Sequence, residues 1–96
     1  MPEQLSASVD CFLDTLRFAR NASEHTVANY SIDLAQFVEY VIARGATSMQ
    51  DVDSRMIRSF LRDLVGYGYA KTSAARTLST IRSFCSFLVE RRELPV

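Results

Sequence analysis

A basic, hydroxyl-rich strip runs along one side of the helix predicted at residues 71–92. At about 100° per residue, small hydroxyl side chains and an arginine fall on one face, and apolar side chains fall on the other. The outward residues are Thr72, Arg76, Ser79, Ser83 and Ser86, and the inward residues are Ala74, Leu78, Ile81, Phe84, Cys85 and Leu88. Short hydroxyl side chains let another surface approach the helix backbone closely, and arginines bind phosphate groups well. The strip therefore predicts an anionic partner, with a solvated helix rich in Ser and Thr as the alternative.

A second polar strip lies on the helix predicted after Ser23. Asn29 and Gln36 are seven residues apart, which places both carboxamides on the outward side of this helix. Asn and Gln side chains can form paired hydrogen bonds with adenine in the major groove of DNA. This side is therefore a candidate DNA-reading surface, and an ordinary exposed helix face is the alternative.

Residues that would support other chemistries lack the required arrangements. The lone His25 has no Cys or second His at a metal-ligand spacing. Gly66 and Gly68 lack the third glycine and the preceding strand of a dinucleotide-binding loop. With one histidine and no strained turn around a serine, a Ser-His-Asp triad is unsupported. The sequence predicts no catalytic residue, no metal and no cofactor, so this chain is not expected to be an enzyme.

Composition indicates one helical domain, residues 1–96. Of the 96 residues, 48% are hydrophobic and 23% charged, which is typical of a globular chain, and three Gly with two Pro favour long helices. The net charge is zero, but residues 1–53 carry three Lys or Arg against eight Asp or Glu, whereas residues 54–96 carry eight against three. This gradient predicts that one flank meets a negative partner; pairing between the halves is the alternative.

The cysteines and the hydropathy pattern indicate a protein of a reducing compartment. Cys11 and Cys85 each lie on the apolar side of a predicted helix, so both are expected to be buried thiols, with a disulfide as the less favoured alternative. No leader sequence and no apolar run near 18 residues is found, so we expect a cytoplasmic protein without a membrane partner.

Four helices are expected to carry the two strips. The first is predicted at about residues 5–21. The second is predicted to begin after an N-cap at Ser23 and end at Gly45. The third is predicted to begin after a cap at Asp53, or at Asp51 as the alternative, and to stop at Gly66-Tyr67-Gly68-Tyr69. The fourth is predicted to begin with Lys71 or Thr72 at its cap and to run to about residue 92, after which the chain leaves in extended form. The predicted fold class is all-α.

The spacing of particular residues in these helices resembles a known family. The pattern is Ser23-x-x-Thr26-x-x-x-Tyr30-x-x-Asp33-Leu34-x-x-Phe37, then Ile57 and Phe60-Leu61, then Lys71-x-Ser73-x-x-Arg76-x-Leu78-Ser79-x-Ile81-Arg82-x-Phe84-x-x-Phe87-Leu88. It is similar to the N-terminal core-binding domain of tyrosine recombinases, especially the Xer-type and integrase-like members. The resemblance covers nearly the whole chain, residues 5–96.

The resemblance implies a fold and a set of partners. In that family the domain is an orthogonal, SAM-like bundle of four helices that forms half of a clamp around double-stranded DNA. A separate C-terminal domain supplies the arginines, histidine and tyrosine nucleophile. Because this sequence ends where the linker to that domain would begin, we expect the catalytic domain of the same polypeptide to lie outside this chain. Other recombinase subunits bound to the DNA are further expected partners.

The resemblance also implies which residues touch DNA, because the family places its second and fourth helices against the major groove. The expected DNA-binding residues are Lys71, Thr72, Ser73, Arg76, Ser79, Arg82, Ser83, Asn29 and Gln36. Arg82 lies nearer the apolar side than Arg76, so an ion pair from Arg82 to a carboxylate such as Asp33 is the alternative for that residue. The zero net charge argues against tight binding by this domain alone, since the phosphate contribution grows with the number of cations engaged.

Two functions therefore follow from the sequence. The first is the DNA-binding module of a site-specific tyrosine recombinase, acting in DNA integration or recombination. The alternative is a helical protein-interaction module, which would explain the neutral charge and would use Tyr67, Tyr69 and a partly exposed Phe87 as its apolar contact.

Overall fold

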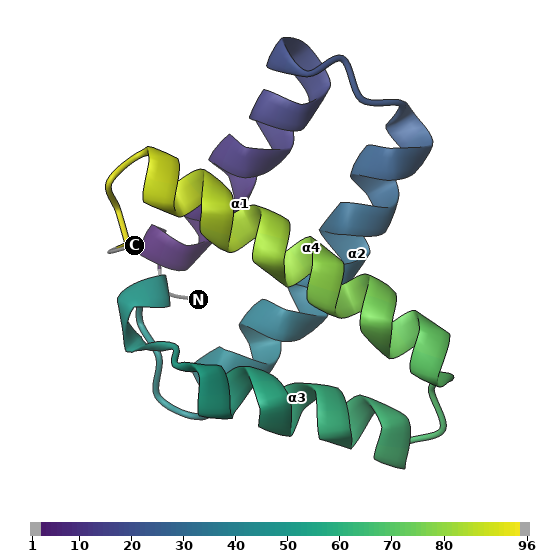
Figure 1. Cartoon of the computed structure of the whole chain (residues 1–96). Helices are drawn as coiled ribbons and strands as arrows, with labels where there is room; N and C mark the ends of the chain where they lie inside the picture. Colours follow the sequence, from purple (N-terminus) through teal and green to yellow (C-terminus); the bar gives the residue numbers. More distant parts are fainter. Residues whose placement is uncertain (1–2, 95–96) are drawn as a thin grey trace.

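The chain folds into four α-helices, as its hydrophobic periodicity predicts. The structure is a computed structural model that describes residues 3–94. The helices are α1 (Glu3–Asp14), α2 (Glu24–Ala43), α3 (Ser54–Gly66) and α4 (Lys71–Glu90) (Figure 1). A short 3-10 helix, η2 (Met49–Asp51), connects α2 to α3, and no strand occurs within the described residues. The predicted all-α fold of four helices is confirmed.

Helices α2 and α4 form the centre of the bundle. Each of them packs against the other three helices, and α4 lies across α1 and α2 in Figure 1, with α3 along one side. Because α2 and α4 also contact each other, the two polar strips predicted from sequence lie on neighbouring helices.

The first helix ends in a wider turn than the sequence predicted. After Asp14 the backbone continues as a π-helix, η1 (Thr15–Ala19), in which the amide of Arg20 donates to the carbonyl of Thr15 at 3.0 Å. The Thr15 hydroxyl donates to the carbonyl of Cys11 at 2.9 Å. Asn21, with a φ of 54°, then adopts the left-handed conformation and ends the helix.

Side-chain caps fix the starts of α2 and α3. The Ser23 hydroxyl accepts a hydrogen bond from the amide of Thr26 at 3.1 Å, and the Asp53 carboxylate accepts one from the amide of Met56 at 2.8 Å. Gly45 ends α2 with a φ of 92°, a conformation that glycine adopts without steric cost. These three predicted boundaries are confirmed.

Both ends of α4 differ from the sequence prediction. Lys71 already belongs to the helix, so the cap position falls on Ala70, whose side chain cannot accept a hydrogen bond. At the other end, Arg92 turns back with a φ of 61°, and the amide of Glu93 donates to the carbonyl of Leu88 at 2.9 Å. The chain therefore folds back at residues 92–94 instead of leaving in extended form, and the rest of the predicted extension, residues 95–96, lies outside the described residues.

Aromatic side chains dominate the core where α1, α2 and α4 meet. The Phe12 ring lies 5.5 Å from the Phe84 ring and 5.3 Å from the Phe87 ring, centroid to centroid. Phe87 is only 5% exposed, so the prediction that it is partly exposed is wrong. Thr77 and Thr80 are buried as well, because the side of α4 that packs on the bundle is wider than its apolar stripe.

Candidate nucleic-acid interface

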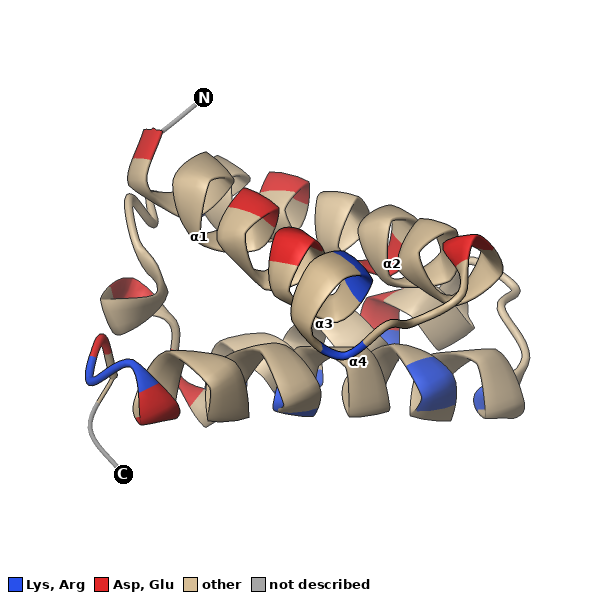
Figure 2. Ribbon diagram, turned by 90° about the horizontal axis from the view of Figure 1, so that it is seen from above, with Lys and Arg blue, Asp and Glu red and all other residues tan. Residues whose placement is uncertain are grey.

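The DNA-binding residues predicted on α4 lie largely on the outside of the molecule. Lys71, Thr72, Arg76, Ser79 and Arg82 are exposed. The two remaining members, Ser73 and Ser83, are half-buried. Figure 2 shows the Lys and Arg positions of α4 spaced along the outer layer that this helix forms, whereas every charged residue of α1 is acidic. The charge gradient of the sequence thus includes a contrast between α1, whose charged residues are all acidic, and the basic positions of α4.

A buried carboxylate joins α2 to α4. Asp33 is 2% exposed, and its Oδ2 accepts a hydrogen bond from the Thr80 hydroxyl at 3.0 Å. Its Oδ1 accepts one from the Thr77 hydroxyl at 3.5 Å and one from Arg76 Nη2 at 3.3 Å. The Thr77 hydroxyl also lies 3.1 Å from the carbonyl oxygen of Ser73, and the Thr80 hydroxyl lies 3.3 Å from that of Arg76, each one turn earlier in α4. Asp33 therefore draws three donors from α4, as burial of a carboxylate requires.

Arg76, and not Arg82, forms the ion pair with Asp33. The sequence placed Arg82 nearer the apolar side of α4 and so favoured it as the alternative partner. In the structure the side of α4 that meets α2 contains Arg76, Thr77 and Thr80, whereas Arg82 lies towards α3. Thr77 and Thr80 do not follow from the sequence pattern, because hydrophobic periodicity assigns only apolar residues to the inward face. The sequence feature that indicates buried donors is Asp33, because it is an acidic residue among the inward positions of α2.

The amide strip of α2 borders the same buried carboxylate. Asn29 precedes Asp33 by one helical turn and Gln36 follows it by just under one turn, and both side chains are half-buried. Gln36 Nε2 donates to the Tyr69 hydroxyl at 3.1 Å, which ties α2 to the turn before α4. We call this region the α2–α4 seam, consisting of Asn29, Asp33, Gln36, Arg76, Thr77 and Thr80. The structure thus places the two predicted strips on contacting helices, which the Arg76–Asp33 ion pair joins.

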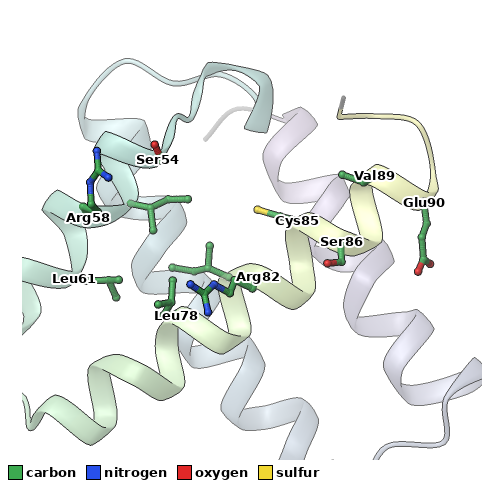
Figure 3. A pocket seen from close by; sticks show the side chains of 11 residues that line it. Ser54, Arg58, Leu61, Leu78, Arg82, Cys85, Ser86, Val89 and Glu90 are labelled. Carbon is green, nitrogen blue, oxygen red and sulfur yellow. The ribbon is translucent and has the colours of Figure 1, made fainter. Parts of the chain in front are cut away.

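Arg82 lies at a different surface, a groove between α3 and α4. The groove has a volume of about 860 Å³. Apolar side chains form most of its lining, namely Ile57, Leu61, Leu78, Ile81, Cys85 and Val89. Figure 3 shows Leu61 of α3 and Leu78 of α4 facing each other across it, with Arg58 and Arg82 near them. We call this surface the α3–α4 groove. Among residues 3–94, Arg58 and Arg82 form no ion pair.

The two cysteines are free thiols, as expected, but both are half-buried, so the prediction that they are buried is wrong. Cys85 lines the α3–α4 groove, and burial raises the pKa of its thiol. His25 is exposed on α2. In the described part of the chain no cluster of three or more His, Cys, Asp or Glu could hold a metal ion. None of the helices there is both long enough and apolar enough to cross a membrane.

Known proteins are similar in sequence to most of this chain. Residues 9–92 match the family described as phage integrase, N-terminal SAM-like domain. The tyrosine recombinase XerC of Halalkalibacterium halodurans is 36% identical over 84 residues, which are 88% of this chain and 28% of that protein. The tyrosine recombinase XerD of Shewanella oneidensis is 32% identical over 91 residues, which are 95% of this chain and 30% of that protein.

A further relative is the tyrosine recombinase XerC of Roseiflexus castenholzii, 36% identical over 87 residues, which are 91% of this chain and 28% of that protein. The chain therefore spans less than a third of the length of these relatives. No solved structure matches the chain significantly.

Proposed function

Because the chain belongs to the family of phage integrase N-terminal SAM-like domains, we propose that it is the DNA-binding module of a site-specific tyrosine recombinase and that it holds duplex DNA through α2 and α4. The family membership, which the spacing of residues in the sequence predicted, is confirmed by the match over residues 9–92. The task of the module is DNA integration or recombination, carried out together with the catalytic part of a longer recombinase.

The observation that carries this function is the α2–α4 seam. There the exposed Arg76 of α4 pairs with Asp33 of α2, and the carboxamides of Asn29 and Gln36 lie within about one helical turn of Asp33 along α2. Guanidinium and carboxamide groups are the side chains best suited to base edges in the major groove. The exposed hydroxyls of Thr72 and Ser79 continue the same helix and can donate to phosphate oxygens.

The charges of this interface fit a module that shares its binding energy. Arg76 is the cation of the seam and already has a carboxylate partner, whereas Lys71 is exposed at the start of α4. Phosphate neutralisation is therefore modest, and affinity for duplex DNA should depend only moderately on salt. Tight binding then comes from the catalytic domain of the same polypeptide and from neighbouring recombinase subunits, which add contacts to one DNA segment.

Duplex binding by charge-matched variants tests this function. Lys71→Ala combined with Arg76→Ala should weaken binding about tenfold at low salt, and each lost phosphate contact should reduce the slope of log affinity against log salt by about one. The matched control is Arg55→Ala with Arg62→Ala, which removes two exposed cations of α3 that line neither the seam nor the groove. Equal effects of the two double variants would refute the α2–α4 interface.

A second candidate function is a helical protein-interaction module, which the α3–α4 groove favours. Its apolar lining and the 82% exposed Tyr67 offer surface to another chain, whereas the buried Phe87 cannot contribute. Sedimentation velocity of the chain mixed with a recombinase relative, with and without duplex DNA, separates the functions. A stable complex without DNA favours protein interaction, and assembly only on DNA favours the DNA-binding module.

A further inference from the structure

Arg76 combines an exposed guanidinium with a fixed inner contact. Its side chain is 57% exposed, while that of Asp33 beneath it is 3% exposed, and Nη2 lies 3.3 Å from Oδ1. A guanidinium carries five N–H donors in a planar fork. Asp33 engages one terminal nitrogen, so donors on the other nitrogens remain available to a molecule that approaches α4 from outside.

Asp33 is itself held in place. The Thr80 hydroxyl donates to Oδ2 at 3.0 Å and the Thr77 hydroxyl to Oδ1 at 3.5 Å, so both carboxylate oxygens have partners from α4. A free arginine loses side-chain entropy when it is immobilised, because its long side chain has many rotamers. Because the anchored carboxylate already restrains Arg76, part of that loss occurs on folding and not on binding.

The carboxylate also changes what Arg76 can bind well. Its negative charge offsets the guanidinium charge, which weakens attraction to a phosphate, but it leaves the outward N–H donors in a set orientation. In the major groove guanine presents two acceptors, O6 and N7, at the spacing of such a fork. The outward N–H donors of Arg76, oriented by Asp33 and with their charge partly offset by it, therefore suit a guanine edge better than a phosphate.

We propose that Arg76 reads a guanine in the major groove and that Asp33 is its positioning residue, acting through the ion pair that crosses from α2 to α4. This assignment rests on the proposed function, because it names the chemistry that the α2–α4 seam recognises. Lys71 is exposed at the start of α4 and has no carboxylate partner among residues 3–94, so it is then available as a phosphate contact.

Selection of duplexes from a random-sequence pool at low salt tests the assignment of Arg76. The duplexes selected by the unaltered chain should share a guanine at one position, and Arg76→Ala should lose that preference. Replacing this guanine by 7-deazaguanine, which lacks the N7 acceptor, should weaken binding of the unaltered chain about tenfold and leave that of Arg76→Ala unchanged.

Asp33→Asn tests the positioning role, because it keeps the shape and an acceptor oxygen but removes the charge. The preference for guanine over 7-deazaguanine should fall, while affinity for unselected duplexes stays the same or rises. In the Arg76→Ala background, Asp33→Asn should not change the preference at all. A purely structural role would instead weaken binding to every duplex alike, and urea unfolding of each variant measures that contribution separately.

The outcomes distinguish this inference from the proposed function. If Arg76→Ala weakens all duplexes equally and lowers the salt slope by about one, Arg76 is a phosphate contact, and only the guanine assignment fails. If Asp33→Asn retains the full preference, Asp33 is not a positioning residue. A chain that binds no duplex even at low salt overturns the proposed function and this inference with it.

Discussion

Helix α4 borders two surfaces of opposite character. Towards α2 it contributes Thr77, Thr80 and Arg76 to a buried carboxylate, so the α2–α4 seam is polar and its hydrogen bonds are satisfied from within. Towards α3 it contributes apolar side chains to an open groove, next to Arg82, which has no ion pair among residues 3–94.

The difference shows how one helix can support both fixed and adaptable recognition. A buried polar group must be matched atom by atom, so the seam has one favourable arrangement and orients Arg76. Apolar contacts are not directional, so a molecule bound in the α3–α4 groove would need a matching shape and apolar area but no particular hydrogen-bond pattern. The seam is therefore the surface expected to discriminate between bases.

Removal of the buried carboxylate should have the largest effect on stability. Asp33→Ala removes a partner of two buried hydroxyls and of Arg76 and leaves a cavity, although the hydroxyls keep the carbonyls of α4, so the free energy of unfolding should fall by about 2–3 kcal/mol. The groove control, Leu61→Ala, truncates a half-buried side chain and should lower it by about 1 kcal/mol. Urea denaturation measures both, and equal losses would contradict the difference between the two surfaces.

Removal of single hydroxyls makes a finer comparison. Thr80→Val keeps the volume of a fully buried side chain but removes the donor to Asp33 Oδ2, so unfolding should become easier by about 1–2 kcal/mol. Ser86→Ala removes an exposed hydroxyl at the groove and should change stability by less than about 0.5 kcal/mol. Thermal unfolding of the two variants is the measurement; a silent Thr80→Val would mean that the seam is not held by its hydrogen bonds.

The thiol in the groove should give the smallest effect, visible only at alkaline pH. Burial raises the pKa of Cys85, so the folded state retains the proton at a pH at which an unfolded thiol, with a pKa of about 8.5, loses it. Its contribution to stability is therefore complete below about pH 8.5 and decreases as pH rises above that value.

Alkylation by iodoacetamide in a Cys11→Ala background checks this shift. The pH at which the alkylation rate rises should be higher for the folded chain than for the chain unfolded in urea. Cys85→Ala should abolish the decrease in the free energy of unfolding at alkaline pH. Coincident pH profiles in the folded and unfolded chain would contradict the burial of Cys85 in the groove wall.

Local features of the fold were predictable because they depend on neighbours in the chain. Ser23, Asp53 and Gly45 mark helix ends through contacts within a few residues, and each lies where the sequence placed it. Phe87 was misjudged because its burial depends on Phe12, a residue of another helix 75 positions earlier. The cap of α4 was misjudged by one residue, since the turn after Gly68 and not a side chain sets its start.

The candidate site was predictable in its residue types but not in its pairing. Arg76, Ser79, Asn29 and Gln36 were selected from helical spacing, and the structure places them on the neighbouring helices α2 and α4. Their contact with DNA stays a prediction. Arg82 was grouped with Arg76 because a helical projection of one helix does not show which neighbour packs on each side.

The sequence by itself determined four amphipathic helices, most of their ends and the family, since periodicity and capping are properties of the local chain. Only the tertiary structure decided which arginine meets Asp33. That choice depends on how α4 crosses α2, because the crossing brings the side of α4 with Arg76, Thr77 and Thr80 onto the buried carboxylate and directs Arg82 to α3.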